Sequence, residues 1–219
     1  METLGPETDS ICSSDIAALG LKDCGKGNLE NPRVLSILAT LLEKCVHKNE
    51  RLLESAPTKE ATTIFHGSRA PSLSIQRYID RISKYSCCSP SCFVVAHIYM
   101  DTFIQRTDLF FLTSLNIHRL LITSVMVAAK FMDDSFFNNA YYARVGGVST
   151  SEMNRLEMKF LFCLDFRLYV SVQTFSKYCS VYKREASGGL IIERSIQACG
   201  AEESWTNKDD STRARSVAR

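Results

Sequence analysis

The densest group of metal-type side chains in the sequence lies in CCSPSC, residues 87–92, with His97 shortly after it. Thiolate sulfur and imidazole nitrogen are ligands that Zn²⁺ prefers, and a structural zinc site needs four of them. The sequence contains no second cluster of cysteines or histidines to complete four ligands. We therefore interpret the segment as a loop that leads into a helix, with small thiols packed under it, and we expect no metal site.

Two other groups invite a chemical interpretation. Asp133 and Asp134 are adjacent carboxylates, but two such neighbours rarely converge on one cation without further ligands. We interpret them as a polar pair just past a helix end. The four histidines are scattered, and none has a cysteine or serine partner at a recognisable spacing, so none is expected to be a catalytic base.

The common enzyme motifs are missing from the sequence. It has no dinucleotide-binding glycine pattern, P-loop or zinc-protease motif. The nucleophile elbow and the protein-kinase signatures are also missing. We expect no catalytic residues and no cofactor, and hence a protein that acts through its surface. Charged residues at the ends of apolar helices are then informative, above all Lys130, which ends the stretch ITSVMVAAK.

Composition limits the classes of partner. The 219 residues are 45% apolar and 23% charged, as in a soluble globular protein. The net charge of +2 is too small to indicate a nucleic-acid or membrane partner. The longest apolar run, from Arg119 to Lys130, is shorter than the roughly 20 residues needed to cross a bilayer. Most of the nine cysteines lie in apolar helical patterns, which predicts reduced thiols in a cytosolic or nuclear protein.

Helical periodicity organises most of the chain and predicts an all-α fold. Residues 1–30 show little apolar periodicity, which predicts a flexible N-terminal arm. Residues 31–71 comprise an N-terminal helix, capped by Asn31 with Pro32 at its first position, and a linker. Residues 72–184 form a dense series of helices, and residues 185–219 form a C-terminal extension with a polar tail.

One predicted helix, starting at Asn116, is apolar nearly all round, which indicates that other helices surround it. Gly146 and Gly147 should end a short helix after it. Ser149 and Glu152 then form the pattern of a capping box at the start of the next helix.

Several segments resemble the plant P-type cyclins, also called U-type, which are related to the yeast cyclins of phosphate-starvation signalling. They include LNIHRLLITSVMVAAKF and FFNNAYYARVGGVSTSEMNRLEMKFLF, and the resemblance covers residues 31–205. It implies a single cyclin box, a five-helix bundle around a buried central helix, with an N-terminal helix and a C-terminal helical extension. It also implies a regulatory subunit that binds and activates a cyclin-dependent kinase, in cell division or in nutrient signalling.

The resemblance also implies site residues. In cyclins, a lysine that ends the central helix and a glutamate on the fifth helix form a pair that holds the kinase C-helix, and Lys130 and Glu157 match these positions. Phe131 and Phe160 are candidates for the apolar part of the same interface. Asp101 matches a further cyclin aspartate, for which a structural role and a kinase contact both remain open.

Two other functions remain open beside this one. A cyclin-fold adaptor of the transcription machinery would usually have two boxes and a basic surface, and this chain has one box and little net charge. A helical scaffold could use the same surface for a partner that is not a kinase. On family grounds we expect the protein in the nucleus and the cytoplasm.

Overall fold

The computed structural model describes residues 18–21, 32–55, 61–108 and 110–187. The expected N-terminal arm, the Asn31 cap and the polar tail lie largely or wholly outside these residues. Within them the chain is helical without strands, so the all-α prediction is confirmed. The helices are α2 (Arg33–Ser55), α3 (Ile75–Ser86), α4 (Pro90–Arg106), α5 (Ile117–Met132), α6 (Asn139–Gly146), α7 (Thr150–Cys163) and α8 (Val172–Ala186).

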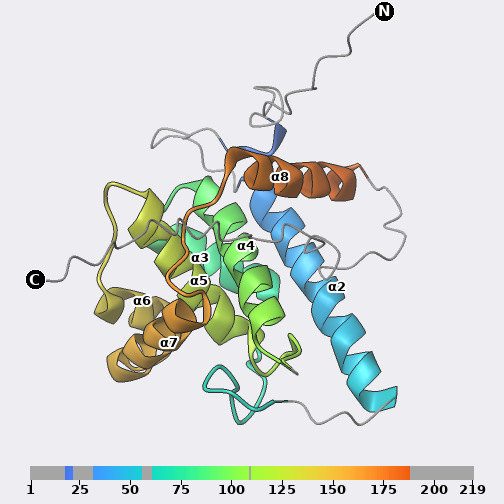
Figure 1. Ribbon diagram of the computed structural model, residues 1–219, viewed down its shortest axis with the longest axis vertical. Coiled ribbons are helices and arrows are strands. Elements are labelled where there is room, and N and C mark those ends of the chain that lie inside the picture. The colour runs from blue at the N-terminus through green and yellow to red at the C-terminus, as the bar shows by residue number, and fades with distance from the viewer. Residues whose placement is uncertain (1–17, 22–31, 56–60, 109, 188–219) are drawn as a thin grey trace, which may run out of the picture.

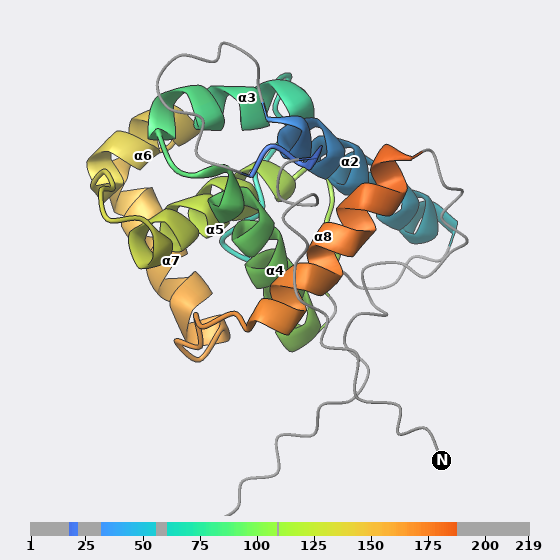
Figure 2. The same ribbon diagram turned by 90° about the horizontal axis from the view of Figure 1, so that it is seen from above.

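Helix α5 lies at the centre of the bundle, as its apolar composition predicted. It packs against α3, α4, α6 and α7, which surround it in both views (Figures 1 and 2). Its polar residues Thr123 and Ser124 are buried, and their hydroxyls donate to the carbonyls of Arg119 and Leu121 at 2.7 and 2.9 Å. The helix thus satisfies its own polar groups and can be enclosed on nearly every side.

An aromatic cluster fills the space between α4, α7 and the segment before α3. Phe103 stacks on Phe160 at a ring distance of 5.4 Å and meets Phe65 and Phe110 edge-on at 4.9 and 5.2 Å. Phe65 comes from the predicted linker, yet it is fully buried. The linker is therefore partly a core element.

The start of α7 uses half of the predicted capping box. The Ser149 hydroxyl accepts from the backbone N–H of Glu152 at 3.1 Å. The Glu152 carboxylate instead pairs with Arg119 of α5 at 2.7 Å. A charge-assisted bond to a guanidinium is stronger than a neutral bond to a backbone amide, so the interhelical pair is preferred. Gly147 follows α6 with φ of +73°, a conformation that suits glycine.

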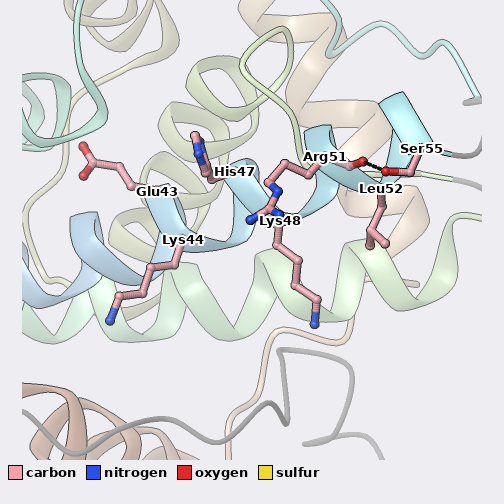
Figure 3. A pocket seen from close by; sticks show the side chains of 7 residues that line it. All are labelled: Glu43, Lys44, His47, Lys48, Arg51, Leu52 and Ser55. Atoms are coloured by element: carbon pink, nitrogen blue, oxygen red, sulfur yellow. Dashed lines mark hydrogen bonds between the residues drawn. The ribbon is translucent and has the colours of Figure 1, made fainter.

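Helices α2 and α8 flank the bundle and contact each other as well as α4. Lys44 of α2 pairs with Glu185 of α8, and an Arg33 guanidinium nitrogen donates to the carbonyl of Ala186 at 3.3 Å. The remaining exposed face of α2 carries His47, Lys48 and other residues beside an open groove (Figure 3).

None of the helices in the described ranges is long and apolar enough to span a membrane.

Replacing Phe160 with alanine tests the aromatic cluster. The deletion leaves a cavity in a fully buried site and should lower the free energy of unfolding by about 3–5 kcal/mol. Phe162, two residues further along α7, is 65% exposed and supplies the matched control. Its replacement by alanine should change stability by no more than about 0.5 kcal/mol. Urea denaturation of both variants measures this, and equal losses would contradict the placement of Phe160.

Candidate functional site

Lys130 occupies the last turn of α5, where its ammonium meets the negative end of the helix dipole. Its Nζ donates to Oε1 of Glu157 on α7 at 2.7 Å. The two side chains remain 26% and 15% exposed, so the pair lies at the protein surface. The structure therefore brings together the two residues that the family resemblance matched. Such a partly exposed pair adds only about 0–1 kcal/mol to stability.

Asn139, at the start of α6, joins this pair and was missed from the sequence. Its side-chain oxygen accepts from Lys130, and its amide nitrogen donates to Glu157 Oε2 at 2.6 Å and to Asn154 at 2.8 Å. A signal was present, because two asparagines follow each other. Asn138 caps α6 by accepting from the N–H of Tyr141 at 3.0 Å. The cap therefore does not need Asn139, whose side chain bonds to Lys130 and Glu157 instead. The network links the end of α5 and the start of α6 to the middle of α7.

Exposed apolar side chains lie on both sides of the network. Phe131, next to Lys130, is 52% exposed, and Met132 is also exposed. Met158 and Phe162 project from α7, one and five residues beyond Glu157, and are exposed as well. Several large apolar side chains exposed close to one another are typical of a protein-binding surface.

A groove of about 470 Å³ continues this surface beyond the end of α5. Its lining is mostly apolar and comes from α4, the end of α5, the α7–α8 connection and the start of α8. Phe131 belongs to it, together with Leu168, Tyr169 and Phe175. Tyr169 is 80% exposed, so a partner that enters the groove would cover a large aromatic surface.

Phe160 does not belong to this surface. It is fully buried and stacks on Phe103, so its side chain has no exposed atom for a partner. The expectation that Phe160 contacts a kinase is corrected here. Along α7, Met153, Leu156 and Phe160 repeat at helical spacing and face the core, whereas Phe162 lies on the opposite, exposed face.

Asp101 is buried on α4, and the structure favours its structural role over a partner contact. Its Oδ2 accepts from the hydroxyl of Tyr178 on α8 at 2.6 Å. The Nδ1 atom of His97, one turn earlier on α4, lies 3.1 Å from the hydroxyl of Tyr182, which also belongs to α8. These two polar contacts, made inside an apolar interface, fix how α8 lies across α4.

Burial changes the pKa values of both α4 residues. It raises the pKa of Asp101 to about 7, against the opposing effect of the Tyr178 hydrogen bond. It lowers the pKa of His97 to about 4. Both side chains therefore tend toward their neutral forms. Cys45 on α2 and Tyr182 on α8 are also titratable and close enough to interact electrostatically with Asp101.

The described residues form a helical domain whose surface combines a charged network with exposed apolar side chains and an apolar groove. Residues 33–168 match the cyclin family. The chain is 59% identical over 172 residues to Cyclin-P3-1 of Oryza sativa subsp. japonica, a match that covers 78% of this chain and 72% of that protein. It is 47% identical over 224 residues to Cyclin-U3-1 of Arabidopsis thaliana, covering 100% of both chains. Cyclin-U4-1 of Arabidopsis thaliana is 51% identical over 161 residues, covering 72% of this chain and 80% of that one.

The chain therefore belongs to the cyclin family, in the group of plant P-type and U-type cyclins. The resemblance inferred from the sequence is confirmed, as is the cyclin-box fold. Cyclins are regulatory subunits and not themselves enzymes. The family match begins with α2 and ends before α8, so the N-terminal helix is part of the shared unit.

Replacing Asp101 with asparagine tests the buried carboxyl, because the amide oxygen can still accept from Tyr178. Between the ordinary pKa of 3.8 and the raised value of about 7, the folded wild type keeps a proton that the unfolded chain has lost. Wild-type stability should therefore fall through this group as pH rises across that window. The asparagine side chain does not titrate, so the variant does not lose this stability. Between pH of about 4 and 7, its stability relative to wild type should rise by up to about 1.4 kcal/mol per pH unit.

His97 has an opposite effect, since its lowered pKa makes stability rise with pH, but it is present in both proteins and largely cancels in the difference. Urea denaturation at several pH values between about 4 and 7 measures the comparison. A stability difference that does not change with pH would show that Asp101 ionises in the folded protein as it does in the unfolded chain.

Proposed function

We propose that this cyclin binds and activates a cyclin-dependent serine/threonine kinase through the surface around Lys130, Asn139 and Glu157. The observation that carries the proposal is the placement of Lys130. It is held by two partners at the surface, although its pairing adds little to folding, and exposed apolar side chains border it.

The network prepares Lys130 for a partner. A free lysine side chain loses up to about 2 kcal/mol of conformational entropy when it is immobilised. Contacts with Glu157 and Asn139 restrict the side chain before the kinase arrives, so less of this entropy remains to be lost on binding. The Lys130 side chain stays 26% exposed, and its ammonium has a third N–H that can donate to an acceptor on the kinase.

Apolar burial supplies most of the affinity in this proposal. Phe131 and Phe162 expose about half or more of their surface, and each square ångström of apolar area covered contributes about 25 cal/mol. The polar centre then fixes the orientation of the partner, since a misplaced kinase would desolvate the Lys130–Glu157 pair without adding an acceptor for the ammonium.

Activation follows from binding one kinase conformation better than the other. A kinase is active when its C-helix glutamate pairs with the lysine of its β3 strand and its magnesium-binding aspartate is in place. A rigid cyclin surface that fits only the inward position of the C-helix shifts the kinase toward that state. The size of the shift equals the difference in affinity for the two states.

The double replacement Lys130→Ala with Glu157→Ala tests the surface. Removing both charges avoids leaving one of them unpaired, so the helical fold and stability should be retained. Affinity for the partner kinase should fall at least about tenfold, in line with the coupling measured for close interfacial charge pairs. Lys177→Ala, on the exposed face of α8, is the matched control and should bind as wild type does.

Binding is measured by titration against a panel of purified cyclin-dependent kinases, with phosphate transfer to a peptide substrate followed for each complex. If the double variant binds and activates as wild type does, the assigned surface is wrong. If wild type binds kinases without activating them, it is an adaptor or inhibitor. If it binds none, a scaffold for a different partner becomes the better interpretation.

We also propose, from the resemblance to the family, that the protein is present in the nucleus and the cytoplasm. Imaging of a fluorescent fusion of the full chain in plant cells tests this, and exclusion from either compartment would contradict it.

A further inference from the structure

Two cysteines and an aspartate meet where the α3–α4 turn touches the end of α5. Cys88 lies in the turn, Cys92 in the first turn of α4, and Asp133 directly after α5. The two sulfurs and a carboxylate oxygen all lie within 4.8 Å of one another. The sequence placed only cysteines of one segment together, and this was the reason to expect no metal. The fold adds the third ligand from a distant part of the chain.

The spacing of these three atoms suits a small cation. Zinc binds thiolate sulfur at about 2.3 Å and carboxylate oxygen at about 2.0–2.2 Å, so ligand atoms around one tetrahedral ion are roughly 3.5–3.8 Å apart. Rotation of the side chains would close the remaining gap. Two thiolates favour zinc over magnesium or calcium, which take oxygen ligands.

The surrounding hydrogen bonds hold the three side chains toward one another. The backbone N–H of Ser89 donates to Asp133 Oδ2 at 3.0 Å, which orients the carboxylate. The Ser86 hydroxyl lies 3.1 Å from the Cys88 sulfur, and the Ser89 hydroxyl lies 3.3 Å from the Cys92 sulfur. Contacts of this kind, one layer outside the ligands, commonly orient metal ligands in proteins.

Tyr142 of α6 is a second, independent indication of a ligand at this place. Its side chain is fully buried, and its hydroxyl makes no hydrogen bond to any of the described residues. Cys88, Cys92 and Asp133, and also Cys87 beside them, interact electrostatically with this hydroxyl, which places it in their neighbourhood. A buried hydroxyl without a partner costs about 1–3 kcal/mol, and a polar ligand in the cluster would remove that cost.

We propose that Cys88, Cys92 and Asp133 bind a zinc ion, with a water molecule as the fourth ligand. The ion would link the α3–α4 turn to the end of α5. Asp133 follows Lys130 by three residues, so the same link would fix the end of the helix that carries the lysine. The zinc site does not depend on the kinase proposal and is tested without a kinase.

The test uses the full chain, purified with a phosphine reductant, stripped with a chelator and titrated with Co²⁺. Cobalt bound to two thiolates gives sulfur-to-metal charge-transfer absorption, and its visible bands report tetrahedral geometry. We expect one ion per chain, displaced by Zn²⁺ and not by Mg²⁺. Zn²⁺ should also raise the midpoint of thermal unfolding, because it binds the folded state.

Cys88→Ser and Asp133→Asn should each weaken Co²⁺ binding by more than about tenfold. Changes to residues that only contact metal ligands already cost about that much, and loss of a ligand should cost more. Each has a neighbouring control, Cys87→Ser and Asp134→Asn, which replace exposed residues outside the cluster and should bind as wild type does. Circular dichroism of the chelated proteins shows whether each variant folds.

Three results would overturn the proposal. Undiminished Co²⁺ absorption in Cys88→Ser and Asp133→Asn would place the metal on other cysteines. The lack of charge-transfer absorption in folded, reduced wild type would show that the cluster binds no metal. A Cys88–Cys92 disulfide found by mass spectrometry in protein purified without reductant, combined with no metal binding after reduction, would make the pair a redox pair.

Discussion

The enclosure of α5 is the constraint on which the rest of the structure depends. A helix covered by α3, α4, α6 and α7 can carry only small, apolar or internally satisfied residues along its length. Charged side chains are therefore confined to the two ends of the helix, with Arg119 near its start and Lys130 in its last turn. Asp133 follows directly after the helix, and the long carbon chain of Lys130 can lie on the core while its ammonium bonds to Glu157. The central packing thus determines where the charged groups of the surface stand.

Much of the fold could be predicted from the sequence because its signals are local. The apolar circumference of α5, the serine before α7 and the glycines that end α6 each determine their element without distant contacts. The Lys130–Glu157 pair was assigned through family resemblance, and the structure places the two side chains in contact. The meeting of Cys88 with Asp133 depends on segments that come together only in the folded chain, so no spacing rule could identify it. For Asn139 the adjacent asparagines were a signal, but its partners Lys130 and Glu157 come from other segments.

The incorrect placement of Phe160 has a different physical cause. Phenylalanine is equally compatible with the core and with an interface, so residue type alone does not decide between them. The spacing of Met153, Leu156 and Phe160 did contain the answer, since residues three and four apart share a helix face. Phe65 is the opposite case, a buried residue whose burial the sequence did not indicate. It is a single aromatic residue in an irregular segment, so no periodic pattern of apolar residues marks it as part of the core.

The buried stripe of α7 has a mechanical consequence. Met153, Leu156 and Phe160 lock the helix against the core, and the ion pair from Glu152 to Arg119 prevents it from turning at its first residues. Rotation about the helix axis would expose the stacked phenylalanines, so α7 resists torque. A partner that presses on Met158 and Phe162 meets a stiff support, and in the proposed complex the deformation then falls on the kinase.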